Sequence, residues 1–175
     1  MSKFTFSKRL SHGLAALCLL LPLQVNSVMA EPNDADGSVE AVLNQLHQNA
    51  ADANWDSYFT LFTDNASFLG TDKTEHWSIQ SFEQYARATK GWSYKLNSRT
   101  ITESDNVAVF DEILEHHKYG LCRGTGTLVF TEQGWKILQY HLSFPVPNDM
   151  AIRVTEQIKL FRQQQKRKAD NANKE

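Results

Sequence analysis

The sequence is short of cysteine, proline and glycine, with two Cys, four Pro and eight Gly in 175 residues. Cys18 lies in an N-terminal segment that we expect to be removed, which would leave Cys122 alone. No intramolecular disulfide could then form, even in an oxidising compartment. Cys122 lies in an apolar alternating stretch, so we predict a buried, unreactive thiol rather than a reactive one.

The sequence also lacks the common short motifs for nucleotide, metal and hydrolase sites. It contains no G-x-S-x-G, P-loop or dinucleotide fingerprint, and neither the H-E-x-x-H nor the C-x-x-C spacing. His116 and His117 are adjacent, and neighbours on a strand point to opposite faces, so we expect that they cannot chelate one ion together. We therefore expect no metal and no cofactor.

Long apolar runs are missing except for Leu14–Leu23, which is too short to span a bilayer as a helix. Lys3, Lys8 and Arg9 precede this run, and small residues ending at Ala30 follow it. This order is typical of a secretory signal peptide. We expect cleavage near Ala30 and a periplasmic or secreted mature protein with no transmembrane segment.

Positive charge is scarce in the body of the chain. Residues 31–158 carry a net charge of −9, whereas residues 159–175 carry +4. An acidic body argues against nucleic acid as a partner, because phosphate binding needs a basic face. The basic end could contact an anionic surface, although a solvated, frayed terminus is the more ordinary interpretation.

Helical periodicity comes first along the chain, and strand periodicity follows. The patterns predict helices over 38–52, after Asn54 and over 78–90, with a short strand at 66–70. The aromatic stripe of the second helix would consist of Trp55, Tyr58, Phe59 and Phe62. After Gly91 the period is two, which predicts hairpin-linked strands over 92–102, 107–116, 121–131 and 135–144.

Pro145 and Pro147 end the last strand, and Asn148 can cap a final helix. Its apolar side would carry Ala151, Val154, Ile158 and Phe161. This stripe could pack on its own domain or on a second subunit. Helices followed by an antiparallel meander indicate an α+β fold.

Four stretches resemble the SnoaL-like domain of the nuclear-transport-factor-2-like superfamily. They are GTD-x-x-E-x-W at 70–77, VAVFDEIL, RGTG at 123–126 and GWKILQYHLSFPVPN at 134–148. The resemblance implies a cone, in which a curved antiparallel sheet holds the N-terminal helices on its concave face and a pocket opens at one end. Members are often dimers, so a homodimer is expected. They include isomerases, cyclases, dehydratases and binding proteins without known chemistry, so the fold leaves the function open.

These observations divide the chain into a signal peptide at 1–30, a loose segment at 31–37, a SnoaL-like domain at 38–148, and a C-terminal helix with a basic tail at 149–175.

The Gly70-Thr71-Asp72 turn raises the first question about a site. Asp72, Glu75 and Trp77 could form one wall of a pocket. Alternatively, Trp77 packs the turn against the third helix while Glu75 accepts hydrogen bonds from backbone N–H groups. The sequence does not choose between these interpretations.

The last strand would place a gradient from apolar to polar on one face. That face would carry Trp135, Ile137, Gln139, His141 and Ser143. We therefore predict Gln139, His141 and Ser143 at the pocket mouth. The competing interpretation is a structural histidine bonded to a neighbouring group.

Asp111 and Glu112 interrupt an apolar strand, and only one of them can point inward. We favour Glu112, whose pKa would be raised among apolar neighbours and which could then act as a general base. Arg123 should pair with Glu112, Asp111 or Glu75. That pair is either an ordinary cross-strand ion pair or, if desolvated, an anchor for a ligand oxygen.

Three functions remain open: a small-molecule-binding protein, a cofactor-independent isomerase or dehydratase, and a protein-interaction module. For the enzyme, Glu112 or His141 would be the base and Arg123 the charge stabiliser. A buried carboxylate–histidine pair would favour the enzyme, and a pocket filled by tryptophans 55, 92 and 135 would favour the module. The predicted ligand-binding residues are Tyr58, Asp72, Glu75, Trp77, Glu112, Arg123, Gln139 and His141.

Overall fold

The computed structural model describes residues 37–172, so the predictions made for residues 1–36 lie outside it. Three helices open this part of the chain: α1 (Val39–Ala51), α2 (Trp55–Phe59) and α3 (Ile79–Arg87). Each begins after a residue whose side-chain oxygen accepts a backbone N–H, namely Ser38, Asn54 and Ser78. The three helices predicted from the periodicity are confirmed, although α3 ends three residues before the predicted boundary.

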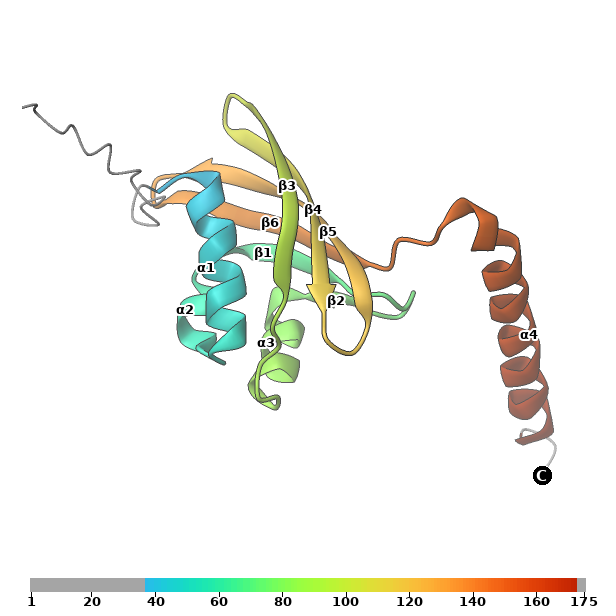
Figure 1. Ribbon diagram of the computed structural model, residues 1–175. Coiled ribbons are helices and arrows are strands. Elements are labelled where there is room, and N and C mark those ends of the chain that lie inside the picture. Colours follow the sequence, from blue (N-terminus) through green and yellow to red (C-terminus); the bar gives the residue numbers. More distant parts are fainter. Residues whose placement is uncertain (1–36, 173–175) are drawn as a thin grey trace, which may run out of the picture. The chain divides into compact units, whose positions relative to one another are not determined.

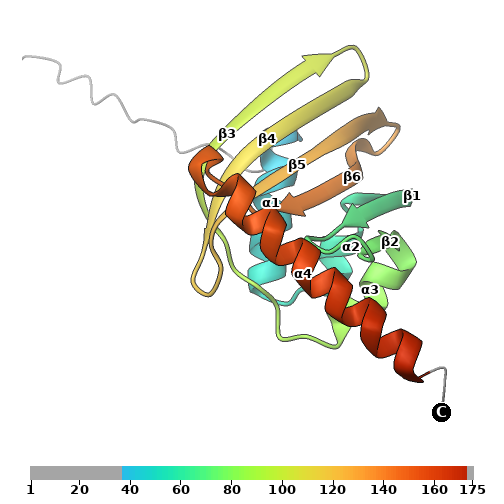
Figure 2. The ribbon, with the colours of Figure 1, turned by 90° about the vertical axis from the view of Figure 1, so that its right-hand side faces the viewer.

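Six strands form one sheet in the order β2-β1-β6-β5-β4-β3 (Figures 1 and 2). They are β1 (Phe62–Leu69), β2 (His76–Ser78), β3 (Lys95–Ser104), β4 (Val107–His116), β5 (Gly120–Thr131) and β6 (Gly134–Ser143). The predicted antiparallel meander is confirmed as β3 to β6. The whole sheet is mixed, because β1 pairs with β6 in parallel. The short β2 was not predicted, because three residues are too few to show an alternation.

The predicted aromatic stripe of the second helix is wrong at Phe62. Helix α2 ends at Phe59, and Phe62 is the first residue of β1. Its ring still contacts Tyr58, with 5.4 Å between the ring centroids. The predicted contact between these aromatic side chains is therefore present, but Phe62 makes it from a strand and not from the helix.

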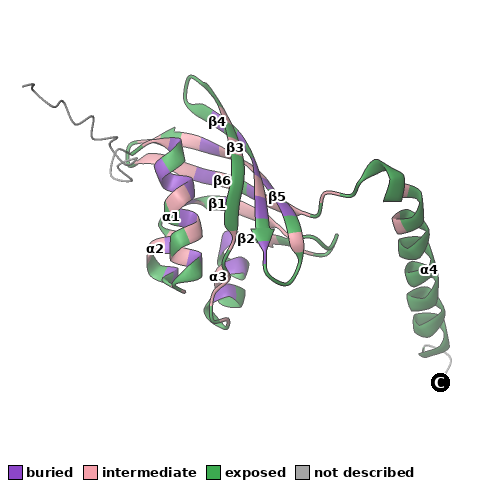
Figure 3. Ribbon diagram, viewed as in Figure 1, coloured by how far each residue is buried: buried purple, intermediate pink, exposed green. Residues whose placement is uncertain are grey.

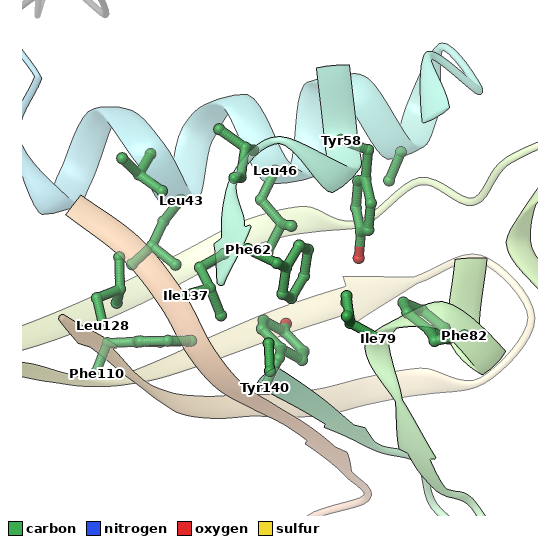
Figure 4. Close-up of a cluster of buried hydrophobic side chains, with 14 of the residues drawn as sticks. Leu43, Leu46, Tyr58, Phe62, Ile79, Phe82, Phe110, Leu128, Ile137 and Tyr140 are labelled. Atoms are coloured by element: carbon green, nitrogen blue, oxygen red, sulfur yellow. The ribbon is translucent and has the colours of Figure 1, made fainter. Parts of the chain in front are cut away.

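Helices α1, α2 and α3 share one buried cluster with a single face of the sheet, which we call the inner face. Figure 4 shows this cluster, with labelled side chains coming from all three helices and from four strands. On the inner face lie Phe110, Glu112, Leu128, Ile137 and Tyr140. Burying each large apolar side chain contributes about 1.5–3 kcal/mol, so this cluster is the main source of stability.

A β-bulge in β6 decides which residues of that strand point inward. Thr127 pairs with Gln139 and Leu128 pairs with Ile137, which leaves Leu138 as an extra residue. Ile137 and Tyr140 are therefore both buried on the inner face, while Gln139 is exposed on the other. The prediction that Ile137, Gln139 and His141 share a face is wrong, because simple alternation does not survive the bulge.

The last helix, α4 (Asn148–Ala172), buries none of its residues. Figure 3 shows it exposed along nearly its whole length. The predicted helix is confirmed. Whether its apolar stripe packs on its own domain or on a second subunit stays an open prediction. Within residues 37–172 no helix is both long enough and apolar enough to cross a membrane.

Candidate functional site

A cavity of about 400 Å³ lies between the helices and the inner face of the sheet. Its wall is largely aromatic, with Tyr58, Phe68, Trp77, Phe82, Trp92 and Tyr140 among the lining residues. Phe68 and Phe82 stack with their ring centroids 3.8 Å apart. The wall therefore consists of rigid, flat side chains supplied by α2, α3, β1, β2 and β6 and by the segment before β3.

Glu112 lies beneath this cavity and is completely buried. Its Oε1 accepts hydrogen bonds from the Tyr140 hydroxyl and from His47 Nε2, both at 2.8 Å. Its Oε2 accepts from Arg99 Nε at 2.9 Å. His47 and Tyr140 both line the cavity. We call Glu112 and its three partners, His47, Arg99 and Tyr140, the Glu112 cluster. The prediction that Glu112 points inward is confirmed.

Arg99 joins the cluster to helix α1. Its Nη1 donates to Glu40 Oε1 at 2.7 Å and to Asn44 Oδ1 at 2.8 Å. Among the described residues its buried Nη2 has no hydrogen-bond partner. Arg99 and His47 also line a smaller cavity of about 170 Å³ on this side. One buried guanidinium thus ties α1 to both β3 and β4.

The pKa of the Glu112 carboxyl is lowered, not raised. Burial alone would raise this pKa, but the hydrogen bond and charge of His47, the charge of Arg99 and the Tyr140 hydroxyl together outweigh burial. The predicted raised pKa is wrong, because sequence reasoning supplied apolar neighbours and no partners. With both oxygens occupied and the group ionised, Glu112 is suited to orient His47 rather than to remove a proton itself.

Tyr140 stays protonated in this setting. Burial raises the pKa of its hydroxyl, and the negative charge of Glu112 raises it further. Burial also raises the pKa of the Tyr58 hydroxyl, and the charges of Tyr94 and Glu112 raise it further. Both phenols can therefore donate hydrogen bonds throughout the physiological pH range.

Gly124 makes room for the Glu112 cluster. A Cβ atom at this position would collide with the Tyr140 hydroxyl and lie 2.8 Å from Glu112 Oε1. The neighbouring Gly126 leaves similar room for the Phe110 ring. The RGTG stretch therefore has a packing reason: its glycines face inward, beneath two large aromatic side chains.

Arg123 lies outside the cavity. Its Nε is 3.1 Å from Asp111 Oδ1, and both side chains are about half exposed on the outer face of the sheet. Asp111 is one of the three partners that the sequence suggested. Because Gly124 takes the inward position on β5, its neighbour Arg123 must point outward. The structure does not bring Arg123 together with Glu112.

Gln139 and His141 of β6 also lie on the outer face of the sheet. Neither residue lines the cavity, and the bulge at Leu138 is the reason. Leu142 and Phe144 line it instead. The predicted place of Gln139, His141 and Ser143 at the pocket mouth is therefore wrong, since none of the three lines the cavity.

The Gly70-Thr71-Asp72 turn satisfies both interpretations offered for it. Glu75 Oε2 accepts the Asp72 N–H at 3.1 Å, and Trp77 packs edge-on against Tyr85 of α3. Glu75 and Trp77 nevertheless line the cavity. Asp72 does not: it is exposed, and its hydrogen bonds from Thr74 lower its pKa. The turn is thus stabilised by its own hydrogen bond and also forms part of the cavity wall.

His116 adds a second histidine to the cavity wall. Its Nδ1 accepts the Lys118 N–H at 3.2 Å, and its ring lies 5.0 Å from that of Tyr94. The prediction that His116 and His117 point apart is wrong, since their ring centroids are 4.5 Å apart. Strand β4 ends at His116, so His117 belongs to the turn and escapes strand alternation. No group of three potential metal ligands occurs within residues 37–172.

Three of the four members of the Glu112 cluster escaped sequence reasoning: His47, Arg99 and Tyr140. A signal for His47 existed, because Glu40, Asn44 and His47 follow one another at helical spacing beside the apolar stripe of α1. Arg99 gave none, since β3 reads as an ordinary polar edge strand. Tyr140 was assigned to the wrong face because the bulge is invisible in the sequence.

Solved structures share this architecture. A nuclear-transport-factor-2-like (NTF2-like) protein of unknown function from Pseudomonas putida KT2440 is 11% identical, with a TM-score of 0.55 over 64% of this chain and 87% of that one. A protein of unknown function from Pectobacterium atrosepticum is 19% identical, with a TM-score of 0.53 over 66% and 98%. An NTF2-like candidate dehydratase from Streptomyces avermitilis is 12% identical, with a TM-score of 0.53 over 62% and 94%.

At these identities the likeness shows the fold alone. No curated protein matches the chain. The SnoaL-like domain family, however, matches residues 39–147, which is more than half of the chain and includes every strand and every residue of the cavity wall. With helices packed against one face of a six-stranded sheet and a cavity between them, the chain belongs to the SnoaL-like domain family and has the NTF2-like α+β fold.

Proposed function

We propose that this protein binds a small, flat, largely apolar organic molecule in the cavity. The supporting observation is the cavity itself, at about 400 Å³ and walled by aromatic rings. Ligand sites in proteins are typically concave, mostly apolar and roughly 300–1,000 Å³ in volume, with a few polar groups that fix orientation. Flat rings of the ligand would stack on, or pack edge-to-face with, the rings of the wall.

The protein-interaction module has less support. A pocket filled by tryptophans 55, 92 and 135 would have favoured the module. Trp92 instead lines the cavity and packs on Trp55, with 4.9 Å between their ring centroids. Trp135 packs instead on Phe130. Of these three tryptophans only Trp92 lines the cavity, and none of them fills it.

Proton transfer is the second candidate function, and the His47–Glu112 hydrogen bond favours it. A buried carboxylate that accepts from Nε2 orients the imidazole and fixes its tautomer. The neutral ring then keeps Nδ1 as a proton acceptor. An isomerase or dehydratase acting on a bound carbonyl compound would need such a base and no cofactor.

Native mass spectrometry of the gently purified protein tests the binding proposal. A discrete added mass, lost on denaturation, is the expected result and would identify the ligand. A protein that carries no added mass and takes up none from a library of aromatic compounds would contradict it. The same spectrum counts the subunits, and a dimer is the expected state.

Deuterium exchange tests the second candidate. Bound carbonyl compounds incubated with the protein in D₂O should gain deuterium next to the carbonyl group. His47→Gln should abolish this gain, and the control His76→Gln, on an exposed histidine that does not line the cavity, should retain it. A gain that survives His47→Gln would exclude His47 as the base.

Export is a separate proposal that rests only on the N-terminal sequence. We infer that residues 1–30 are removed and that the mature protein is periplasmic or secreted. N-terminal sequencing of the protein from a periplasmic fraction should begin at Glu31. A mature chain that still begins at Met1 would contradict this.

A further inference from the structure

The cavity has a second polar region, separate from the Glu112 cluster. It is the end of β4 and the turn that follows, where His116, Lys118 and Tyr119 all line the cavity. His116 is four residues beyond Glu112 on β4, or about 13 Å along the strand. We call residues 116–119 the histidine turn.

His116 presents a hydrogen-bond donor in this region. Since Nδ1 accepts the backbone N–H of Lys118, the neutral ring must carry its proton on Nε2. Tyr94 and Tyr119 pack on the same ring, with centroids 5.0 and 4.9 Å away. The imidazole is thus held in one orientation by two aromatic rings and one hydrogen bond.

The charges that face His116 are positive. Burial lowers its pKa, and the charges of His117 and Lys118 lower it further. Tyr94 and Tyr119 are its other titratable neighbours, and burial raises the pKa of Tyr94, which keeps that phenol neutral.

Carboxylates are absent from this group. Within residues 37–172, none lies within 4.0 Å of the His116 ring or the Lys118 ammonium, and that ammonium sits over the Tyr119 ring at 5.0 Å. On the cavity wall, Glu75 has an oxygen engaged by the Asp72 N–H. The buried charge of Glu112 is offset by Arg99.

We propose that the histidine turn binds a carboxylate carried by the flat ligand, with His116 Nε2–H and Lys118 as its two donors. This inference rests on the proposed binding function and narrows its ligand class to aromatic or similarly flat carboxylic acids. The carboxylate of the ligand would supply the negative charge that the histidine turn lacks. Charge-assisted hydrogen bonds in a half-enclosed apolar site are the strong kind, so the carboxylate would also fix which end of the ligand meets the Glu112 cluster.

Two probes with the same ring system test the proposal: 2-naphthoate and the neutral 2-naphthamide. We expect 2-naphthoate to bind about tenfold more tightly, because only its carboxylate makes charge-assisted hydrogen bonds to His116 and Lys118. In NMR titrations of the histidine side chains, 2-naphthoate should raise the pKa of His116, and 2-naphthamide should leave it unchanged.

Lys118→Met should remove most of the preference for 2-naphthoate while leaving the affinity for 2-naphthamide as it was. Lys95→Met is the matched control, since Lys95 is exposed on β3 and does not line the cavity. It removes the same charge and should leave the preference intact.

The outcomes separate the two proposals. Equal affinities for the two probes, with the His116 titration unmoved, would overturn the carboxylate site and leave the binding function standing. A preference that survives Lys118→Met and His116→Phe would also overturn it. Failure of both probes to bind would count against the binding function itself.

Discussion

Strand β4 carries two acids in succession, and each pairs with an arginine on a neighbouring strand. Glu112 pairs with Arg99 of β3 on the inner face, where the side chains are 0% and 3% exposed. Asp111 pairs with Arg123 of β5 on the outer face, where they are 51% and 46% exposed. Each pair joins an acid to an arginine, and the two acids are adjacent on β4. The main difference between the pairs is therefore the face of the sheet on which they lie.

The difference lies in what surrounds each pair. Asp111 has water as an alternative partner, and exposed ion pairs of this kind contribute about 0–1 kcal/mol. Within residues 37–172, Glu112 has only His47, Arg99 and Tyr140 as hydrogen-bond partners. Removing one member of a buried pair leaves an uncompensated charge. The inner pair therefore fixes the architecture of the site, and the outer pair is close to neutral.

Glu112→Gln should give the largest effect. It removes the buried carboxylate partner of the Arg99 guanidinium and leaves it the half-exposed Glu40 on the helix side, so we expect the free energy of unfolding to fall by about 3–5 kcal/mol. Asp111→Asn, the matched outer substitution, should change it by about 1 kcal/mol or less. Urea unfolding followed by circular dichroism measures both, and equal losses would show that the face of the sheet does not matter.

Gly124→Ala should come next. The new methyl group would meet the Tyr140 hydroxyl and Glu112 Oε1, and overpacking of this kind costs about 1–3 kcal/mol. Thr125→Ala, on the outward-facing neighbour, provides the control and should cost less. If Gly124→Ala unfolds at the wild-type urea concentration, the Tyr140–Glu112 contact is looser than described.

Acid should separate the two carboxylates further. The pKa of Glu112 is lowered in the folded state, so its stabilising contribution is present above the ordinary value of 4.5 and is lost as the pH falls through the folded pKa. The unfolding free energy of the wild type should therefore fall below about pH 4.5, and Glu112→Gln should flatten this part of the profile. Asp111→Asn should retain the wild-type slope, and a flattened slope in that variant would assign the effect to the wrong acid.

His116 should give the smallest effect, at a higher pH. Its pKa is lowered in the folded state, so as the pH falls below its ordinary value of 6.5 the unfolded chain takes up the proton first. Stability should decline slightly below pH 6.5 for this reason, and His116→Phe should remove the decline. The exposed His76 is the control, because its charge is not among those that act on His116, and His76→Gln should keep the decline. A decline that persists in His116→Phe would place the titrating group elsewhere.

Much of the fold was readable from the sequence because it depends on neighbours along the chain. Ser38, Asn54 and Ser78 cap helices through bonds to residues three positions on, and the meander follows from alternation and hairpin turns. Alternation also placed Asp111 and Glu112 on opposite faces, and the apolar neighbours of Glu112 indicated which one points inward. These are local rules, and they held wherever the strand stayed regular.

The site itself was decided by tertiary structure. His47 reaches Glu112 from 65 residues away, and nothing in the sequence around either residue names the other. One extra residue in β6 turned Tyr140 inward and Gln139 outward, and the parallel pairing of β1 with β6 closed the cavity wall. The sequence by itself determined the elements and their faces, since these follow from local periodicity. The partners, and hence the lowered pKa of Glu112, depend on contacts between distant segments, which form only when the sheet and helices pack.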